Sequence, residues 1–306
     1  MGRKEPLLRF GVFEQVHVPP APAFKGDYHL AAFKPEWDFQ TYKQAFDIMR
    51  GFLQSGDIYQ AKLTFPMAAA YKGCLVRLYE RLKQKQPVPF GAFVDLGGAK
   101  LLCRSPELFF SLSVDGQLRT RPMKGTIKRG ANATEDEALK AWLSHSEKNQ
   151  AENLMIVDLL RNDLGISCES GSIQASPLFE LRRFSNVQHL VSTITGTLKT
   201  DVTPLQALFS AFPGGSITGA PKKRAMEIIA ELEPVARGAY CGSFFWMDDQ
   251  GNLDSNILIR TLQTEGDRLY CHGGGGIVFD SIPEAEYEES RFKVARLMGA
   301  LEDRFL

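Results

Sequence analysis

Cysteine and histidine are scarce in this 306-residue sequence, and neither type is grouped. The five cysteines stand singly, without the close spacing of a zinc site, and the five histidines are equally dispersed. An odd number of scattered cysteines indicates reduced thiols rather than a disulfide framework, so we expect a cytoplasmic protein. The cysteines are Cys74, Cys103, Cys168, Cys241 and Cys271.

Long apolar runs and an excess of charge of either sign are also absent. No segment approaches the roughly 20 apolar residues of a membrane span, and the N-terminus lacks the apolar core of a signal peptide. Lys+Arg and Asp+Glu both number 36, so any anionic ligand must be held by local charge, and we expect neither a nucleic acid nor a membrane as partner. A chain that is 44% hydrophobic and 24% charged is typical of a globular protein with a sizeable core.

The order of helices and strands favours an α+β fold. Residues 1–35 are expected to hold an N-terminal strand and a connector rich in proline at 18–23, and residues 36–306 a single domain. Periodicity predicts helices at 37–53, 74–85, 134–163, 203–211, 221–232 and from 283 onward. Strands are predicted at 58–65, 187–199, 238–247, 256–264 and 268–271, with three β-rich runs between 90 and 126.

Thr134 and Glu137 are expected to form a capping box at the start of the helix over 134–163, and Gly165 to end that helix. Short turns between successive strands favour large antiparallel sheets over a doubly wound parallel sheet.

A glycine-rich loop at 213–222 leads into one predicted helix. Pro221 suits the first position of that helix, whose free N–H groups could bind an anion. The loop does not match a phosphate-binding loop, because Ala220 and Pro221 separate its last glycine from Lys222. Simple helix capping is the alternative.

Four consecutive glycines at 273–276 follow a predicted strand. Residues without a Cβ atom allow a ligand to approach the backbone closely. A flexible hairpin is an equally consistent interpretation.

Three carboxylates on two predicted helices are candidate metal ligands. Glu286 and Glu289 project with Lys293 from one face of the last helix, although such a face is usually solvated. Glu152 precedes an apolar row, where a carboxylate is costly unless it is paired or bound to a metal. If the helices met, oxygen donors alone would suit Mg²⁺.

Lys124 and Glu107 are candidates for covalent and acid–base chemistry. Lys124 lies at a strand end, where a lysine is most often solvated; as a nucleophile it would need burial or a cationic neighbour such as Arg121. Glu107 could donate a proton or merely pair with a surface base.

These motifs, in this order, resemble the chorismate-utilising enzymes, a family of anthranilate, aminodeoxychorismate (para-aminobenzoate), isochorismate and salicylate synthases. The resemblance covers residues from about 36 to 304 and implies two large antiparallel sheets packed as a sandwich, with helices outside. Its motifs are Gly56-Asp57-Ile58-Tyr59-Gln60, Ser105-Pro106-Glu107, Lys124-Gly125-Thr126, the segments 151–163, 187–192 and 213–222, Ile259-Arg260-Thr261, Gly274-Gly275-Gly276-Ile277-Val278 and Glu286-Tyr287-Glu288-Glu289.

The resemblance also implies a role for each candidate residue toward chorismate, a dianion with a hydroxyl that must leave. Mg²⁺ held by Glu152 and Glu289, with Glu286 acting through water, would bind the ring carboxylate. The catalytic residues would be Lys124, Glu107, which protonates the leaving hydroxyl, and His189 near it. The substrate-binding residues would be Arg260, Tyr240 and the Gly276 N–H at the enolpyruvyl carboxylate, with Lys293, Gly275, Thr126 and Ser216.

Lys124 points to the branch that makes 4-amino-4-deoxychorismate, since the anthranilate and isochorismate branches resemble Pro-Ile-Ala-Gly-Thr at this position. The lysine amine would attack C2 as the C4 hydroxyl leaves, and ammonia would then add at C4. The glycine loop resembles the same branch. No glutaminase motif is present, so a separate glutaminase subunit is the expected source of ammonia.

Two departures from the family pattern stand out. The chain resembles a short form without most of the N-terminal region, so we expect no tryptophan feedback and a weaker glutaminase contact. Asn149 replaces an acidic residue one turn before Glu152. Anthranilate synthase, isochorismate synthase and a non-catalytic partner-binding paralogue remain the alternatives.

Overall fold

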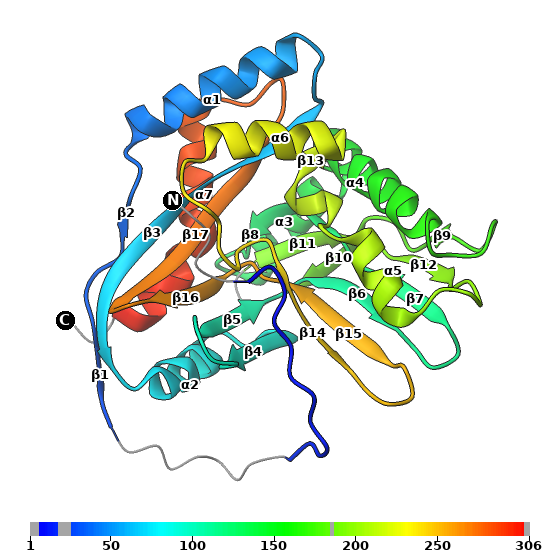
Figure 1. The fold of residues 1–306 in the computed structure, drawn as a ribbon. Coiled ribbons are helices and arrows are strands. Elements are labelled where there is room, and N and C mark those ends of the chain that lie inside the picture. Colours follow the sequence, from blue (N-terminus) through cyan, green and yellow to red (C-terminus); the bar gives the residue numbers. More distant parts are fainter. Residues whose placement is uncertain (1–5, 18–25, 184–186, 303–306) are drawn as a thin grey trace. The chain divides into compact units, whose positions relative to one another are not determined.

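The computed structural model describes residues 6–17, 26–183 and 187–302. The chain divides into two compact units (Figure 1). Unit 1 comprises Met1–Pro106, Gly219–Gly242 and Leu258–Leu306, and unit 2 comprises Glu107–Thr218 and Ser243–Ile257.

Unit 1 is built on an eight-stranded antiparallel sheet in the order β1-β3-β17-β16-β5-β4, with β2 and β13 also paired to β3. The strands are β1 (Tyr28–Leu30), β2 (Lys34–Pro35), β3 (Gln60–Gly73), β4 (Phe90–Val94), β5 (Leu101–Ser105), β13 (Gly219–Ala220), β16 (Thr261–Glu265) and β17 (Arg268–Ile277). Its helices are α1 (Phe39–Gln54), α2 (Leu75–Lys85), α6 (Lys222–Leu232) and α7 (Pro283–Glu302).

Unit 2 holds a six-stranded antiparallel sheet, β14-β15-β6-β7-β12-β9, and a three-stranded one, β10-β11-β8. The strands are β6 (Leu108–Leu112), β7 (Gln117–Thr120), β8 (Met123–Lys128), β9 (Gln174–Ala175), β10 (Glu180–Arg183), β11 (Val187–Val191), β12 (Ile194–Thr197), β14 (Ser243–Met247) and β15 (Leu253–Ile257). The helices are α3 (Ala133–Ser144), α4 (Glu147–Gly165), α5 (Pro204–Ala211) and the 3₁₀ turn η1 (Gly215–Ile217).

The expected α+β class with antiparallel sheets is confirmed, and the third, smaller sheet is an addition. The expected strands at 187–199 and 256–264 are each two strands, which join different sheets. Residues 6–17 contain no helix or strand, and the strands within 1–35 are β1 and β2. The proline-rich segment 18–23 lies outside the described residues. A single domain over 36–306 stays a prediction.

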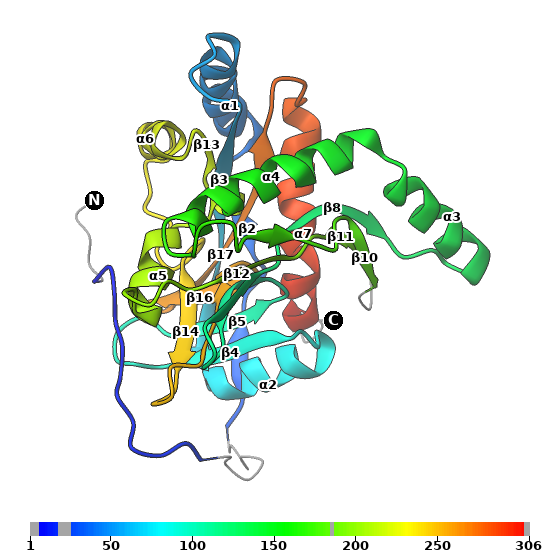
Figure 2. The same ribbon diagram turned by 90° about the vertical axis from the view of Figure 1, so that its right-hand side faces the viewer.

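The helix expected over 134–163 is two helices, α3 and α4, which Figure 2 shows meeting at a corner. Ser146 starts α4 as its N-cap, because its hydroxyl accepts from the backbone N–H of Asn149. The capping box at Thr134 was wrong: Asn132 caps α3 by accepting from the N–H of Glu135. Gly165 is the last residue of α4 rather than a residue beyond its end.

The glycine run is a strand interior rather than a flexible hairpin. β17 pairs with β3 over ten residues, and the pairing includes all four glycines (Figure 1). A Cβ atom on Gly273 would lie 2.3 Å from the backbone oxygen of Ser290 on α7. The missing side chain therefore allows α7 to pack directly onto the strand.

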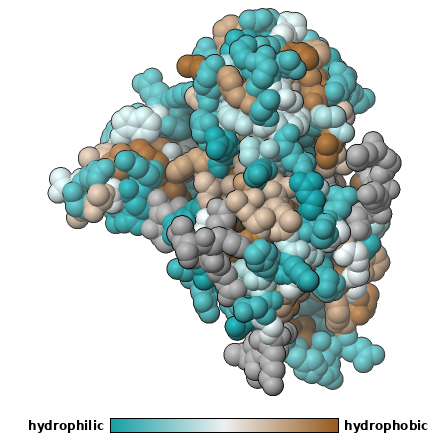
Figure 3. Space-filling model, turned by 90° about the vertical axis from the view of Figure 1, so that its left-hand side faces the viewer, coloured by the Kyte–Doolittle hydropathy of each residue, from teal (hydrophilic) through white to brown (hydrophobic). Residues whose placement is uncertain are grey.

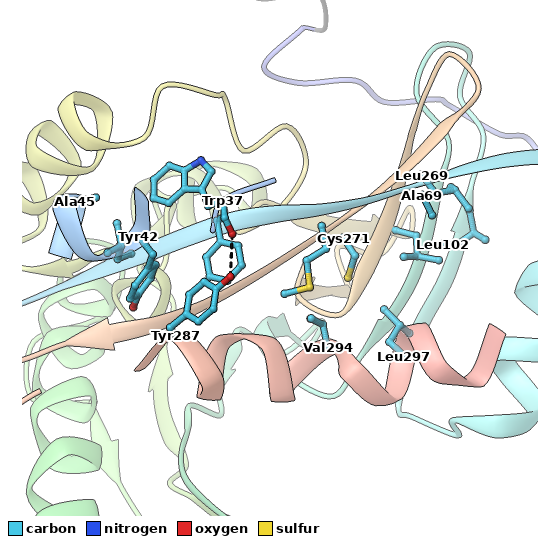
Figure 4. Close-up of a cluster of buried hydrophobic side chains, with 14 of the residues drawn as sticks. Trp37, Tyr42, Ala45, Ala69, Leu102, Leu269, Cys271, Tyr287, Val294 and Leu297 are labelled. Atoms are coloured by element: carbon cyan, nitrogen blue, oxygen red, sulfur yellow. Dashed lines mark hydrogen bonds between the residues drawn. The ribbon is translucent and has the colours of Figure 1, made fainter. Parts of the chain in front are cut away.

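The core of unit 1 fixes the position of α7 on the sheet. Tyr287 is buried, stacks on Phe65 of β3 with ring centroids 5.0 Å apart, and donates its hydroxyl to the Trp37 backbone oxygen at 2.9 Å (Figure 4). Val294 and Leu297 continue the same buried row along the helix. Burying such a row stabilises the packing by about 1.5–3 kcal/mol per large side chain.

No helix among the described residues combines the length and the apolar character needed to cross a membrane. On the face drawn in Figure 3, small apolar groups lie among hydrophilic side chains.

Candidate functional site

Lys124 and Glu152 form an ion pair inside unit 2. The Lys124 Nζ atom on β8 lies 2.8 Å from the Glu152 Oε2 atom on α4, and the two side chains are only 22% and 20% exposed. The ion-pair partner of the lysine is thus a carboxylate, and a role for Arg121 as a cationic neighbour stays a prediction. Arg121 is half-buried two residues before β8, and partial burial, followed by the nearby Arg119 and Arg182, lowers its pKa.

Asn153 holds α4 against the three-stranded sheet and so places Glu152 beside Lys124. Its buried amide donates to the backbone oxygens of Lys124 and Leu190, each at 3.3 Å. Its amide oxygen accepts from the Ser192 hydroxyl at 2.6 Å. Sequence reasoning missed this residue, although an asparagine inside an apolar helix row next to Glu152 was a usable signal.

Gly125 allows the same close approach from the strand side. Its φ is +88°, a conformation that L side chains rarely adopt, and a Cβ atom there would lie 3.2 Å from the Asn149 side-chain oxygen. Both the positive φ and the close contact with Asn149 therefore favour glycine at the position after Lys124.

His189 and Thr126 form a second polar pair in the same sheet. They are opposite each other in the β8–β11 register, and the His189 Nδ1 atom lies 2.8 Å from the Thr126 hydroxyl oxygen. His189 is buried. Between Thr126 and Met123, β8 is bulged: the register with β11 shifts between His189 and Val191, and Gly125 has a positive φ, so the side chains of Lys124 and Thr126 do not follow the regular alternation of a strand.

Glu107 and Ser216 complete the candidate residues of unit 2. Glu107 is 6% exposed, and its Oε1 atom accepts from the Ser216 hydroxyl at 3.4 Å. The 3₁₀ turn η1 carries Ser216 and packs closely on α4, since a Cβ atom on Gly215 would lie 2.3 Å from Leu159. The glycine-rich loop thus belongs to both units, and Pro221 is the N-cap of α6 rather than its first residue.

In unit 1, α7 presents its polar face to the glycine strand. The Lys293 Nζ atom lies 2.6 Å from Glu289 Oε1 and donates to the Gly274 backbone oxygen at 3.1 Å. Glu286 accepts from the Ser281 hydroxyl at 2.7 Å. A Cβ atom on Gly275 would lie 2.6 Å from the other Glu286 carboxylate oxygen, so the glycine makes room for this carboxylate.

Arg260 and Tyr240 lie next to the same sheet. Arg260 directly precedes β16 and has a positive φ of 51°, a strained conformation of the kind that clusters at functional sites. Its backbone oxygen accepts from Arg104 at 3.0 Å. Tyr240 is partly buried, and burial raises the pKa of its phenol well above the usual value, so the hydroxyl keeps its proton.

Gly276 pairs with Lys62 of β3 and lies beside Gln60, a residue that sequence reasoning did not select for a role. A Cβ atom on Gly276 would be 2.4 Å from the Gln60 amide nitrogen, and the buried Gln60 amide oxygen has no hydrogen-bond partner within the part of the chain that the structure describes. The Gln60 amide group therefore lies next to the backbone of β17 at Gly276, where no side chain covers it.

The three carboxylates expected to bind Mg²⁺ are divided between the units, with Glu152 in unit 2 and Glu286 and Glu289 in unit 1. Within the described residues, no three His, Cys, Asp or Glu side chains gather as a metal cluster. Each of the three residues offers carboxylate oxygens, which are the donors that a hard cation prefers, and Gly275 makes room for the Glu286 carboxylate.

Comparison with known proteins identifies the family of this chain. Residues 11–299 match the family model for chorismate binding enzymes. Aminodeoxychorismate synthase component 1 of Klebsiella aerogenes is 43% identical over 298 residues, which are 97% of this chain and 65% of that protein. Anthranilate synthase component 1 of Bacillus subtilis (strain 168) is 41% identical over 260 residues, 84% of this chain and 50% of that protein.

A solved structure shares the fold. The crystal structure of anthranilate synthase component I from Streptococcus pneumoniae TIGR4 superposes with a TM-score of 0.81 at 34% identity, covering 92% of this chain and 62% of that one. This chain thus spans less than two thirds of the length of each of these relatives. The match over nearly the whole chain shows that it belongs to the chorismate binding enzyme family.

Proposed function

We propose that this chain aminates chorismate to 4-amino-4-deoxychorismate, a precursor of para-aminobenzoate and folate, as component I of an aminodeoxychorismate synthase. The observation that carries the proposal is Lys124: a lysine whose ammonium meets a carboxylate at 2.8 Å, two residues from the Thr126–His189 pair. The similarity to aminodeoxychorismate synthase component 1 supports the same branch.

In the proposed reaction Lys124 is the nucleophile. An ammonium bound to Glu152 has no lone pair to donate, so the ion pair must open and the lysine must release a proton first. The amine then bonds to C2, the ring double bonds shift toward C4, and the C4–O bond breaks. Glu107 gives the departing hydroxyl a proton, so that it leaves as water.

Ammonia completes the reaction in the reverse sense. It bonds to C4 and loses a proton, the double bonds shift back, and the C2–N bond breaks with its electron pair returning to Lys124. His189, held by Thr126, is assigned to the face where the hydroxyl leaves. The net change replaces one hydroxyl by one amino group and releases one water.

The substrate carboxylates require positive or hydrogen-donating partners. We assign the enolpyruvyl carboxylate to Arg260, Tyr240 and the Gly276 backbone N–H, with Gly275 and Lys293 beside them and Ser216 near Glu107. Glu152, Glu286 and Glu289 would hold Mg²⁺, which supplies, when bound, positive charge for the ring carboxylate. The all-oxygen donor set supports this assignment.

A glutaminase subunit is the proposed source of ammonia. The Klebsiella aerogenes relative is named component 1, and we found no glutaminase motif in the sequence.

A second candidate function is anthranilate synthesis, because the Bacillus subtilis and Streptococcus pneumoniae relatives carry that name at 41% and 34% identity. That reaction also consumes ammonia but releases pyruvate. Isochorismate synthesis, with water as nucleophile, would proceed without ammonium.

The test is a product assay with chorismate, Mg²⁺ and ammonium, read by mass spectrometry. We expect 4-amino-4-deoxychorismate without pyruvate, and no product when ammonium is omitted. Lys124→Ala should lower the rate by at least about 100-fold if the covalent step is used, since acid–base groups alone contribute 10²–10⁴. Anthranilate with pyruvate, or isochorismate without ammonium, would refute the proposal.

A further inference from the structure

Tyr240 is supported by an aromatic partner from the neighbouring strand. Its ring and the imidazole of His272 lie nearly parallel, with an interplanar angle of 15° and ring centroids 5.1 Å apart. His272 is on β17, immediately before the four glycines. Because side chains alternate along a strand, His272, Gly274 and Gly276 share one face, so the stack places Tyr240 on the face of Gly276.

The turn that carries Tyr240 is anchored to strand β3 by hydrogen bonds of Arg237 and Glu233. Arg237 forms a bidentate pair with Glu233, at 2.7 and 2.8 Å, and donates to the Lys62 backbone oxygen at 3.1 Å. Glu233 in turn accepts from the backbone and the hydroxyl of Thr64 on β3. The backbone of Tyr240 is therefore tied to β3, and its N–H donates to the Arg237 oxygen at 3.1 Å.

These backbone contacts leave the rotation of the Tyr240 ring to be fixed by its side-chain neighbours. His272 is suited to that task because its imidazole ring is planar and uncharged at neutral pH. Burial, followed by the charge of Arg237, lowers the pKa of the imidazole to about 3. A neutral ring stacks on a phenol without placing a charge next to the substrate carboxylate.

We infer that His272 is a positioning residue, which stacks on Tyr240 and aims its hydroxyl at the carboxylate of the substrate. The inference rests on the proposed function, which assigns Tyr240 to the enolpyruvyl carboxylate. It differs from a catalytic role for the histidine, because the flat ring acts through Tyr240 and the imidazole nitrogens are not used.

The test compares His272→Ala with His272→Phe, which keeps a flat ring, each in the wild-type and Tyr240→Phe backgrounds. Chorismate affinity is measured by calorimetry with Mg²⁺ present. Aromatic pairs contribute about 0.5–1.5 kcal/mol, so His272→Ala should weaken binding about two- to twelvefold, and His272→Phe less than about twofold. In the Tyr240→Phe background, His272→Ala should add almost nothing.

A readout without substrate keeps the inference separate from the proposed function. The NMR signals of the Tyr240 ring, assigned with Tyr240→Phe, should shift in His272→Ala and stay near their wild-type positions in His272→Phe. Unchanged signals in His272→Ala would overturn the inference, as would equal losses of affinity in the two tyrosine backgrounds. If wild-type protein fails to bind chorismate, the proposed function fails, whereas the ring signals still decide whether His272 orients Tyr240.

Discussion

Lys124 lies 2.8 Å from Glu152 in unit 2, and the same relationship recurs in unit 1, where Lys293 lies 2.6 Å from Glu289. Both carboxylates are proposed metal ligands, and each already forms an ion pair with a lysine ammonium group. A bound cation must therefore compete with a lysine or share the carboxylate with it.

Breaking the Lys124–Glu152 pair should destabilise the protein moderately. Lys124→Met leaves a carboxylate that is only 20% exposed without its counter-charge, and we expect the free energy of unfolding to fall by about 1–2 kcal/mol, between the values for exposed and buried pairs. Urea unfolding measures the change. The matched control is Lys43→Met, which breaks an exposed pair with Asp47 and should change stability by less than about 0.5 kcal/mol. Equal losses in both variants would contradict the expectation.

The same substitution should tighten Mg²⁺ binding. With the competing ammonium removed, we expect the dissociation constant for Mg²⁺, measured by calorimetry, to fall several-fold in Lys124→Met. The control Lys43→Met should leave it unchanged, because its partner is Asp47, which is not a proposed ligand. A weaker Mg²⁺ affinity in Lys124→Met would show that the lysine and the cation do not compete.

Asn153→Ala should cost about 2–3 kcal/mol of stability. The substitution removes three hydrogen bonds at a fully buried position and leaves the oxygens of Lys124 and Leu190 without this donor. Chemical denaturation measures the loss. Leu154→Ala, at the next and 43% exposed position of α4, is the control and should have little effect. A similar small change in both variants would mean that Asn153 does not hold α4 in place.

Gly275→Ala should affect metal binding more than folding. The new Cβ atom would lie 2.6 Å from a Glu286 carboxylate oxygen, and that flexible side chain can move aside, so we expect a stability change below about 1 kcal/mol. Mg²⁺ affinity should nevertheless drop several-fold, as calorimetry would show. Gly51→Ala in α1, where a Cβ atom meets nothing within 4 Å, should leave Mg²⁺ affinity unchanged. Unaltered affinity in Gly275→Ala would argue against Glu286 as a ligand.

His272 should make the protein less stable in acid. Its pKa is lowered to about 3 in the folded chain, against about 6.5 when unfolded, so between these values the unfolded chain binds more protons. The contribution is fully present above pH 6.5 and is lost as the pH falls toward 3. Urea unfolding from pH 4 to 8 should therefore show a shallower pH dependence below 6.5 in His272→Phe, with a constant difference from wild type above pH 7. Parallel curves over the whole range would refute the assignment.

Elements with local signals were predictable from the sequence. The helix α7 follows its apolar row through Tyr287, Val294 and Leu297, and begins at Pro283, as expected. The strand β17 was predicted too short, because glycine disfavours strands and only its pairing with β3, about 200 residues away, holds Gly273–Gly276 extended. Non-local pairing of this kind leaves little trace in a single sequence.

The candidate site shows the same limit. Spacing alone left Glu286 and Glu289 as a solvated face, and the family resemblance was needed to select them. The ion pair of Lys124 with Glu152 was not predicted, because Glu152 lies 28 residues away and is placed beside Lys124 by the hydrogen bonds that Asn153 makes from α4. The corner at Ser146 was missed because a cap inside a continuous helical pattern looks like a surface serine.

The chain passes between the two units four times, and the passages fall beside candidate residues: Glu107 begins unit 2, Ser216 lies just before one passage, and Tyr240 and Arg260 flank two others. Our proposal assigns Lys124, Glu107 and His189 to bond making and breaking, and unit 2 holds all three. Arg260, Tyr240 and Gly276, which would grip the substrate, belong to unit 1. In this proposal, the residues that make and break bonds and the residues at the enolpyruvyl carboxylate therefore come from different stretches of the sequence. Chimeras in which segments 107–218 and 243–257 are exchanged with those of an anthranilate synthase would show whether unit 2 determines which product is formed.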